Sequence, residues 1–467
     1  MNNKIAALLL LSIILSCTPA LARGGGHKYL YRLTLTDKKG TPYSLDNPSA
    51  FLSQKAIDRR HRQGLAIDST DLPIPPQYIR RIEAVGCEVV VKSKWNNTVL
   101  VGIDKPSQYK ELKELPFVAD AKKVYTQPDD ERESEVREQY HTTLNQLDTI
   151  YGDNYGMAKE QIEMVGGIGL HRRGFTGKGM TIAVFDAGFM NADRIPAMTK
   201  INVVGTHDYL SDDADEMYRG ESHGTMTLSV IGVNEPGVFV GTAPDASFWL
   251  FRCEDAATET SAEEDYWTAA AEFADSVGVD VINSSLGYHD FDDTETNYHY
   301  YDQNGRTSLI SCTSSMLAGK GIIHVNSAGN DGMGTWKKIN FPSDAYDMIS
   351  VGAVTPQGIN ASFSSVGPTA DGRVKPDVVA LGSPTTVVSG RGTLTSETGT
   401  SFSAPIVCGL VACLWQALPD KTAREIIELV RQSGNNYAHP DNIYGYGLPD
   451  FTKALKQGRN EKDTVTP

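Results

Sequence analysis

The most constraining feature of this sequence is a run from residue 402 to residue 415 that is apolar almost without interruption. A helix that is apolar on every side lies inside a protein rather than on its surface, so the run predicts a buried core helix. Ser401 directly precedes the run, in Gly399-Thr400-Ser401. Free backbone N–H groups and the positive end of the helix dipole stabilise an anion at such a helix N-terminus. Ser401 is therefore placed where an oxyanion would be stabilised.

Short apolar strands alternate with helices from about residue 155 onward. We expect strands at 180–185, 246–252, 279–283, 321–326 and 348–354, and helices at 223–231, 261–277, 308–317 and 422–431. Ser261 and Glu264 have the spacing of a capping box at the start of the second helix. The alternation predicts an α/β domain with a doubly wound, mainly parallel sheet over residues 155–457, followed by a polar tail at 458–467. Such sheets carry their functional groups at the carboxyl ends of strands.

The residues before this domain form a different unit. Strands are expected at 29–36, 87–92, 98–103 and 118–125, and helices at 49–62, 76–85 and 106–115. This mixture predicts a small α+β domain over residues 23–126. Residues 127–154 are strongly charged and lack apolar periodicity, which is typical of an exposed, protease-sensitive linker.

The N-terminus and the overall charge indicate where the protein works. Residues 1–22 combine Lys4, an apolar stretch and the small-residue site Ala20-Leu21-Ala22, which is typical of a secretory signal peptide. The alternative is a lipid anchor at Cys17. No other segment approaches the length of about 18 apolar residues that a transmembrane segment needs. We expect a secreted or periplasmic protein, and the net charge of −15 argues against nucleic acid as a partner.

The six cysteines are too few for a disulfide framework in a secreted chain of this length. Cys253 and Cys312 could pair, and the sequence leaves that open. Buried free thiols are the favoured interpretation.

Four residues at the ends of predicted elements form a chemical set. Asp186 follows the strand 180–185, His223 begins a helix, and Asn330 lies in a glycine turn after the strand 321–326. The helix dipole disfavours the charged form of His223, which suits a neutral general base. With Ser401 these residues supply a nucleophile, a base, a carboxylate that orients the base and an amide donor for an oxyanion. This set predicts acyl transfer.

The surrounding motifs resemble those of the subtilisin-like serine proteases over roughly residues 155–448. The matching segments are Val184-Phe185-Asp186-Ala187-Gly188, Ser222-His223-Gly224-Thr225, Ile282-Asn283-Ser284-Ser285-Leu286-Gly287, Asn326-Ser327-Ala328-Gly329-Asn330, Phe363-Ser364-Ser365-Val366-Gly367-Pro368, Lys375-Pro376-Asp377-Val378 and Gly399-Thr400-Ser401-Phe402-Ser403-Ala404-Pro405.

The resemblance implies roles for individual residues. Ser401 would attack the peptide carbonyl, His223 would transfer the proton, Asp186 would orient His223, and Asn330 with the Ser401 N–H would bind the oxyanion. Substrate would be held by Ser285, Leu286 and Gly287 through strand addition, and by Ala328 and Gly329 at the pocket for the residue before the cut. The partners would be polypeptide substrates and the chain's own propeptide, residues 23–126, acting as an intramolecular inhibitor that the enzyme removes itself.

Some positions depart from the family pattern. Ala187 stands where Ser or Thr is usual, which removes an expected hydrogen bond to Asp186. Met226 and Ile406 replace histidines that commonly occur in the family. Asn340 precedes Phe341-Pro342, where glycine is often found at the floor of the specificity pocket. We expect Asn340 either to narrow the pocket with a polar amide or to turn away and cap its own loop.

The chemistry implied by the resemblance needs no cofactor, but structural calcium is common in the family. The loops 208–216 and 290–302 are rich in carboxylates, which suit Ca²⁺, and no metal-binding residue can be assigned. Two alternative functions are a catalytically weak or inactive binding protein on the same fold, which a fluorophosphonate probe would test, and an esterase. Esterases of the Gly-x-Ser-x-Gly type carry their serine ahead of the acid and the histidine, the reverse of the order here.

Overall fold

The structure, a computed structural model, describes residues 27–127 and 154–461. The predicted signal peptide, Cys17, most of the charged linker and most of the polar tail lie outside these residues.

The N-terminal domain is a four-stranded antiparallel sheet with helices on one face. The strands β1 (Tyr29–Leu35), β2 (Glu88–Ser93), β3 (Thr98–Ile103) and β4 (Val118–Thr126) pair in the order β2-β3-β1-β4. The helices α3 (Pro76–Glu83) and α4 (Pro106–Lys113) contribute Ile82 and Leu112 to one core, with Val99 and Val101 of β3. Leu100, between these two valines, points to the opposite face and joins the core of the second domain.

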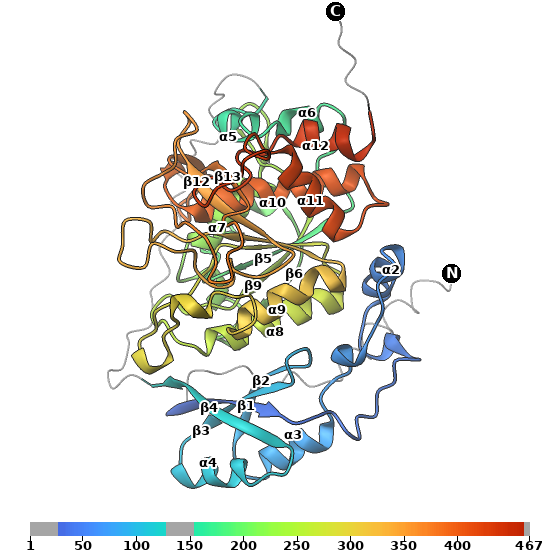
Figure 1. Cartoon of the computed structure of the whole chain (residues 1–467), viewed down its shortest axis with the longest axis vertical. Helices are drawn as coiled ribbons and strands as arrows, with labels where there is room; N and C mark the ends of the chain where they lie inside the picture. The colour runs from blue at the N-terminus through green and yellow to red at the C-terminus, as the bar shows by residue number, and fades with distance from the viewer. Residues whose placement is uncertain (1–26, 128–153, 462–467) are drawn as a thin grey trace, which may run out of the picture.

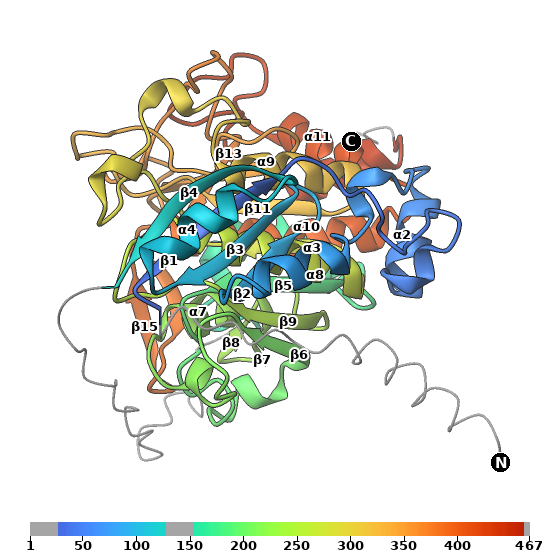
Figure 2. The ribbon, with the colours of Figure 1, turned by 90° about the horizontal axis from the view of Figure 1, so that it is seen from below.

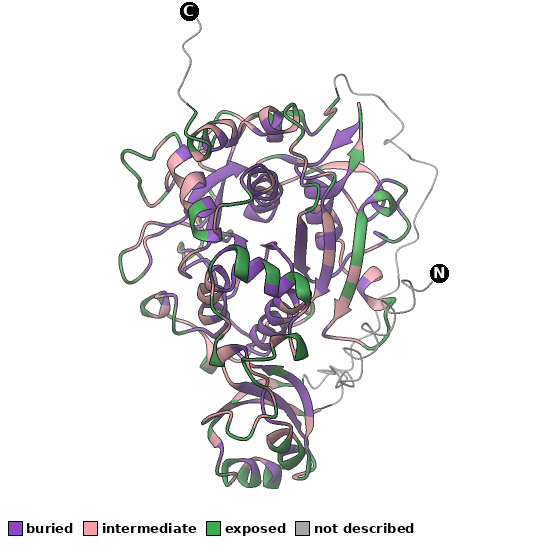
Figure 3. Ribbon diagram, turned by 90° about the vertical axis from the view of Figure 1, so that its right-hand side faces the viewer, coloured by how far each residue is buried: buried purple, intermediate pink, exposed green. Residues whose placement is uncertain are grey.

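The second domain confirms the predicted α/β fold. Its seven strands form a parallel sheet in the order β13-β12-β11-β10-β5-β9-β6. They are β5 (Thr181–Asp186), β6 (Asn202–Asp208), β9 (Ser247–Arg252), β10 (Val281–Ser284), β11 (Ile323–Ser327), β12 (Ile349–Val354) and β13 (Val378–Leu381). The inner strands are buried, purple in Figure 3, because helices cover both faces.

Helices on the two faces form separate cores. On one face lie α7 (His223–Gly232), α10 (Thr400–Ala417), α11 (Ala423–Ser433) and α12 (Phe451–Gly458), and on the other α8 (Glu263–Val277) and α9 (Leu309–Leu317). Residues of β5 alternate between them, since Ile182 and Val184 pack in the α10 core while Ala183 and Phe185 pack in the α8 core. Smaller elements complete the domain: α5 (Lys159–Glu163), α6 (Gly167–His171), β7 (Asn234–Glu235), β8 (Phe239–Val240), and the hairpin of β14 (Thr385–Val388) and β15 (Leu394–Glu397).

The core helix α10 is buried along its whole length, as its apolar run predicts. By length and composition alone it would pass as a membrane span, so the expectation that no segment reaches that length is wrong for α10. However, 94% of the apolar window is buried inside the protein. Its apolar surface is therefore accounted for by the sheet and by the neighbouring helices.

Three details of the predicted elements are wrong. The helix expected at 49–62 begins only at Gln54, because Ser53 caps it, and forms α2 (Gln54–Arg62). The helix α8 begins at Glu263 with Ala262 as its N-cap rather than Ser261. Ser261 instead donates its hydroxyl to Glu264 at 3.1 Å. The edge strands β6 and β13 were not predicted.

The N-terminal domain is tied to α8 and to the loop after α9 by buried charges. The helix α2 stands beside the end of α8 (Figure 1), and Figure 2 shows the N-terminal sheet lying across α8 and α9. Arg59 and Arg60 both pair with Asp275, Arg60 at 2.7 Å. Asp71 accepts from Arg60 at 2.7 Å and from Lys320 at 3.0 Å. Burial of these groups is tolerated because each charge has a partner.

Further carboxylates of α8 meet the N-terminal sheet. Asp265 pairs with Arg32 at 2.6 Å, and Glu264 pairs with the same arginine at 3.4 Å. Glu272 accepts three hydrogen bonds from the turn between β2 and β3, donated by Ser93 Oγ, Lys94 N and Trp95 N at 2.6–2.9 Å. One helix of the second domain thus carries much of the contact with the first.

All cysteines in the described ranges are free thiols, so Cys253 and Cys312 do not pair. Four of the five are buried, in line with the interpretation as small apolar residues.

Candidate active site

Asp186 and His223 meet at the carboxyl end of β5. Asp186 is the last residue of the strand and is fully buried. Its Oδ1 accepts hydrogen bonds from His223 Nδ1 at 2.8 Å and from the Ala187 N–H at 2.9 Å. The Nδ1 proton is therefore fixed toward the carboxylate, and Nε2 is the nitrogen left to exchange a proton with another group.

Thr227 supplies the contact that Ala187 cannot make. Its hydroxyl donates to Asp186 Oδ2 at 3.1 Å, from one turn further along α7. The carboxylate of Asp186 is thus held through both oxygens despite the alanine. The sequence pattern did not reveal Thr227, although its position four residues after His223 places both on one face of the helix.

A close approach of the backbone allows this geometry. The Gly224 N–H donates to Gly188 O at 2.9 Å. A Cβ on Gly224 would lie 2.3 Å from that oxygen and 2.9 Å from the Asp186 Cβ. The glycine after His223 is therefore required for α7 to lie against the end of β5.

The ionisation of His223 differs from the expectation drawn from the helix dipole. Burial lowers its pKa, but the Asp186 carboxylate and its hydrogen bond, with smaller effects from Glu254 and Glu221, raise the pKa to about 9. The helix dipole therefore does not set the direction of the pKa shift of His223, because a carboxylate at 2.8 Å outweighs the dipole of a helix end.

Ser401 lies in the first turn of α10, as predicted. Its hydroxyl contacts Ser285 O at 3.4 Å, and the side chain of the next residue, Phe402, lies 5.8 Å from the His223 ring between centroids. Pro405 has no N–H, so it cannot bond the Ser401 carbonyl as a helix residue normally would. The Ser285 hydroxyl donates to that carbonyl instead, at 2.9 Å.

Asn330 is anchored to the same helix. Its Oδ1 accepts from the Thr400 N–H and from the Thr400 hydroxyl, both at 3.0 Å. The Gly329 N–H in turn donates to Thr400 Oγ1 at 3.2 Å. With the carbonyl oxygen held, the amide NH₂ of the exposed Asn330 side chain is the group that remains available for another acceptor. Thr400 is a second residue of the site that the sequence did not reveal.

The side chain of Asn340 lies between the two predicted walls of the pocket. A Cβ on Gly287 would lie 2.9 Å from the Asn340 Cβ, and one on Gly329 would lie 2.9 Å from its Cγ. Its Oδ1 is buried without a hydrogen-bond partner in the described chain, and its backbone carbonyl, not its side chain, bonds Ser343 N–H at 2.8 Å. The side chain thus points toward Gly287 and Gly329 rather than capping its own loop.

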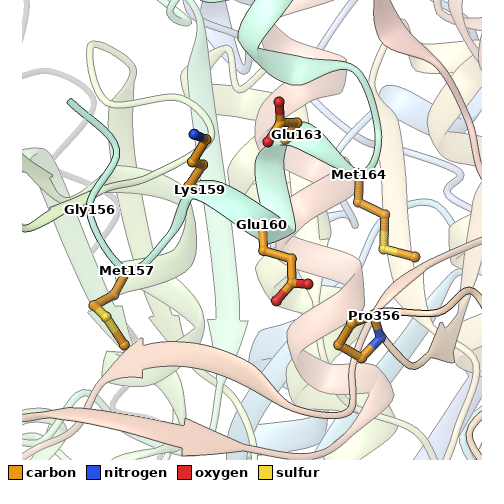
Figure 4. Close-up of a pocket in the computed structure, with 7 residues that line it drawn as sticks. All are labelled: Gly156, Met157, Lys159, Glu160, Glu163, Met164 and Pro356. Carbon is orange, nitrogen blue, oxygen red and sulfur yellow. The ribbon is translucent and has the colours of Figure 1, made fainter. Parts of the chain in front are cut away.

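The other departures from the family pattern lie away from these contacts. Ile406 is fully buried in the α10 core, and Met226 packs at the edge of the same core. The acidic loops 208–216 and 290–302 do not bring together three metal-ligating side chains among the residues with a described structure, and calcium in them stays a prediction. A pocket lined by residues between Gly156 and Met164 and by Pro356 contains none of the candidate site residues (Figure 4).

Comparison with known proteins agrees with this arrangement. The model of the Subtilase family (Peptidase S8) matches residues 177–447, more than half of the chain. The chain belongs to the subtilase family. A second model, the Peptidase S8 propeptide domain of Bacteroidota, matches residues 30–141. The chain is thus a serine endopeptidase of the subtilase family with an N-terminal propeptide domain.

Two relatives illustrate the distance to characterised subtilases. Subtilisin NAT of Bacillus subtilis subsp. natto is 29% identical over 290 residues, covering 62% of this chain and 68% of that protein. Mycosin-1 of Mycobacterium tuberculosis is 28% identical over 317 residues, covering 60% and 69% respectively. Among solved structures, MycP1 from the ESX-1 type VII secretion system has a TM-score of 0.52 at 22% identity and covers 70% of this chain, which shows the fold alone.

Proposed function

We propose that this subtilase is a secreted endopeptidase made as a self-processing zymogen, with Ser401, His223 and Asp186 as its catalytic triad. The observation that carries the proposal is the hydrogen bond of 2.8 Å from His223 Nδ1 to the buried Asp186, with Ser401 in the first turn of the neighbouring helix. A buried carboxylate bonded to histidine Nδ1 and a serine at the start of a neighbouring helix suit the roles of orienting acid, base and nucleophile in acyl transfer.

The reaction proceeds in two stages in this proposal. The Ser401 Oγ attacks the peptide carbonyl while its proton passes to His223 Nε2, and the resulting oxyanion accepts hydrogen bonds from the Asn330 amide and the Ser401 N–H. The proton then passes from His223 to the leaving amine as the C–N bond breaks, which leaves an acyl-enzyme. Water, deprotonated by His223, cleaves that ester and restores Ser401.

Substrate recognition follows from the same edge of the sheet. Ser285, Leu286 and Gly287 lead away from the end of β10 and would pair with the substrate backbone by strand addition, while Ala328 and Gly329 line the opposite wall. Since Asn340 lies between Gly287 and Gly329, we propose that it narrows the pocket for the residue before the cut. Small or hydrogen-bonding side chains would then be preferred.

The propeptide domain would act as an inhibitor before its removal, and the position of its last strand supports this part of the proposal. Its last strand, β4, ends beside residues 260–261 and 292–296 of the catalytic domain, and Lys123 pairs with Asp293 at 3.1 Å. The chain that continues from Gln127 therefore starts close to the segment that follows β9. Export by the signal peptide of residues 1–22 is part of the proposal.

The test uses the chain from residue 23 with Ser401→Ala. We expect the parent to react with a fluorophosphonate probe and to mature, with a new N-terminus between about Tyr125 and Tyr155, and the variant to stay unlabelled and full-length. Ser403→Ala is the matched control, because Ser403 lies on the same helix but donates to Ala380 O at 3.3 Å, away from His223.

Three results would each contradict a part of the proposal. An unlabelled parent would favour a binding protein on a protease fold, and maturation of Ser401→Ala at the parental rate without other proteases would exclude self-processing. A mature N-terminus before residue 100 or beyond Met157 would refute the predicted cleavage region.

A further inference from the structure

Three glutamates gather next to the candidate active site. One carboxylate oxygen from each of Glu254, Glu259 and Glu263 lies within 4.8 Å of the other two. Glu254 directly follows Cys253, whose N–H donates to the backbone oxygen of Asp186 at 3.1 Å. The cluster is thus connected to the end of β5 through one residue.

Among the described residues, the cluster is not neutralised by lysine or arginine, although His223 interacts electrostatically with Glu254 and His289 with Glu259. In the part of the chain with described coordinates, none of the three forms an ion pair with lysine or arginine, whereas Glu264 and Asp265, the next residues along α8, both pair with Arg32. Glu263 is only 1% exposed. Its Oε1 accepts from the Thr260 N–H at 2.9 Å, but its Oε2 is buried without a partner. A buried carboxylate oxygen without a partner is costly, which points to a missing ligand.

Tyr288 gives an independent indication. Its hydroxyl is also buried and has no partner in the described chain, although a buried tyrosine hydroxyl usually finds one. Tyr288 packs in the same core as Cys253 and Ala262, the chain neighbours of Glu254 and Glu263. Burial, and then the charges of these two glutamates, raise the pKa of Tyr288 well above its usual range, so its hydroxyl stays neutral. The Tyr288 hydroxyl is thus a fourth oxygen, and it comes from a segment that is hydrogen-bonded to Phe341 and is separate from α8.

We propose that Glu254, Glu259 and Glu263 bind a divalent cation of the size of Ca²⁺, with the Tyr288 hydroxyl in its immediate surroundings. Three oxygens within 4.8 Å of one another lie no more than about 2.8 Å from a common centre, so a small inward movement of the side chains brings them to the Ca²⁺–oxygen distance of about 2.3–2.6 Å. Mg²⁺ requires about 2.0–2.1 Å and near-ideal octahedral geometry, so it fits this spacing less well.

A cationic side chain of a substrate is a less suitable occupant. An ammonium or guanidinium group would have to reach the Oε2 of Glu263, which is shielded from solvent at the start of α8. A bare ion can occupy that position, while Glu254 and Glu259, which are partly exposed, leave sites for water. The six to eight ligands that Ca²⁺ takes are then within reach.

The cation would join two segments that flank the candidate site. Glu254 to Glu263 connect the end of β9 to α8, and Tyr288 directly follows Gly287 of the predicted substrate edge. Binding would fix these segments relative to each other. The inference concerns metal binding itself and does not depend on the catalytic roles proposed above.

The test measures calcium binding in the full-length chain carrying Ser401→Ala, which prevents self-digestion. After removal of bound metal, isothermal titration with CaCl₂ is compared between this parent, Glu263→Gln and Glu259→Gln. We expect each glutamine variant to lose one binding event and the calcium-dependent increase in Tm that goes with it. Glu160→Gln, an exposed glutamate of α5 outside the acidic loops, is the matched control and should keep both.

The outcomes separate the proposal from its alternatives. No calcium binding by the parent, or an unchanged number of binding events in Glu263→Gln and Glu259→Gln, would overturn it. If Glu263→Gln does not fold, the more exposed Glu259→Gln decides. Absence of calcium binding together with slower cleavage of Lys- or Arg-containing peptides by the active enzyme carrying Glu254→Gln would identify a substrate side chain instead of a metal.

Discussion

Replacement of Asn340 by glycine should widen the specificity pocket. The Asn340 side chain lies against Gly287 and Gly329, since a Cβ added to either glycine would come within 2.9 Å of it. Its removal frees space for about two methylene groups. At about 0.8 kcal/mol per buried methylene the gain for a large apolar side chain is roughly 1.5 kcal/mol, or about tenfold in kcat/KM.

Loss of the Asn340 amide is a second contribution that favours large apolar side chains in the glycine variant. The buried Oδ1 of Asn340 has no hydrogen-bond partner among the described residues, so an apolar side chain entering the parent pocket would keep it desolvated at a cost of about 1–3 kcal/mol. The free protein already bears part of this desolvation cost. We therefore keep a tenfold increase in kcat/KM as the expected change. The preference should shift toward Phe and Leu before the scissile bond.

The assay is a peptide library in which only the residue before the cut varies, with active-site titration to normalise the enzyme concentration. Asn340→Leu is the control, because it keeps the pocket narrow while removing the amide. It should accept Phe less well than Asn340→Gly does, because only the glycine variant adds space. Identical library profiles for the parent and Asn340→Gly would refute the placement of Asn340 in the pocket.

Two further predictions concern the catalytic groups. Asn330→Ala should lower kcat by about 10²–10³ with little change in KM, a magnitude taken over from subtilisin rather than worked from this structure, and an unchanged kcat would remove Asn330 from the oxyanion hole. The rate should also depend on His223, whose pKa of about 9 in the resting protein means that the neutral base forms only as the pH rises. Therefore kcat/KM should increase with pH well above 6.5, and a midpoint at or below 6.5 would contradict the dominance of Asp186 over burial and the helix dipole.

Elements with strong patterns could be predicted from the sequence. The core helix α10 and the inner strands have long apolar runs that only a buried position explains, so their type and order follow directly. The edge strand β6 is different, because its outward residues Val203 and Val204 are exposed and its sequence has no buried-strand pattern. The start of α8 was also misplaced, since Glu264, expected to cap the helix, is engaged by Arg32 and by Tyr298 from distant segments.

The candidate site also contains some residues that the sequence predicted and others that it did not. Asp186, His223, Asn330 and Ser401 lie in short motifs at strand or helix ends, which made them recognisable. The groups that hold them, Thr227 and Thr400, carry no such signal, because a threonine inside a helix usually has a purely local role. The raised pKa of His223 was missed for a related reason, since the effect of Asp186 depends on a distance that only the fold determines.

The acidic face of α8 has a consequence for the kinetics of inhibition after the propeptide has been cut. Glu264, Asp265 and Asp275 would remain on the enzyme, while their partners Arg32, Arg59 and Arg60 would leave with the propeptide. The separated surfaces then carry opposite charge, which accelerates diffusional encounter and makes it sensitive to ionic strength. A free propeptide would consequently rebind the enzyme quickly in dilute salt and more slowly in concentrated salt. The ionic strength of the surroundings would therefore influence how long the cleaved enzyme remains inhibited.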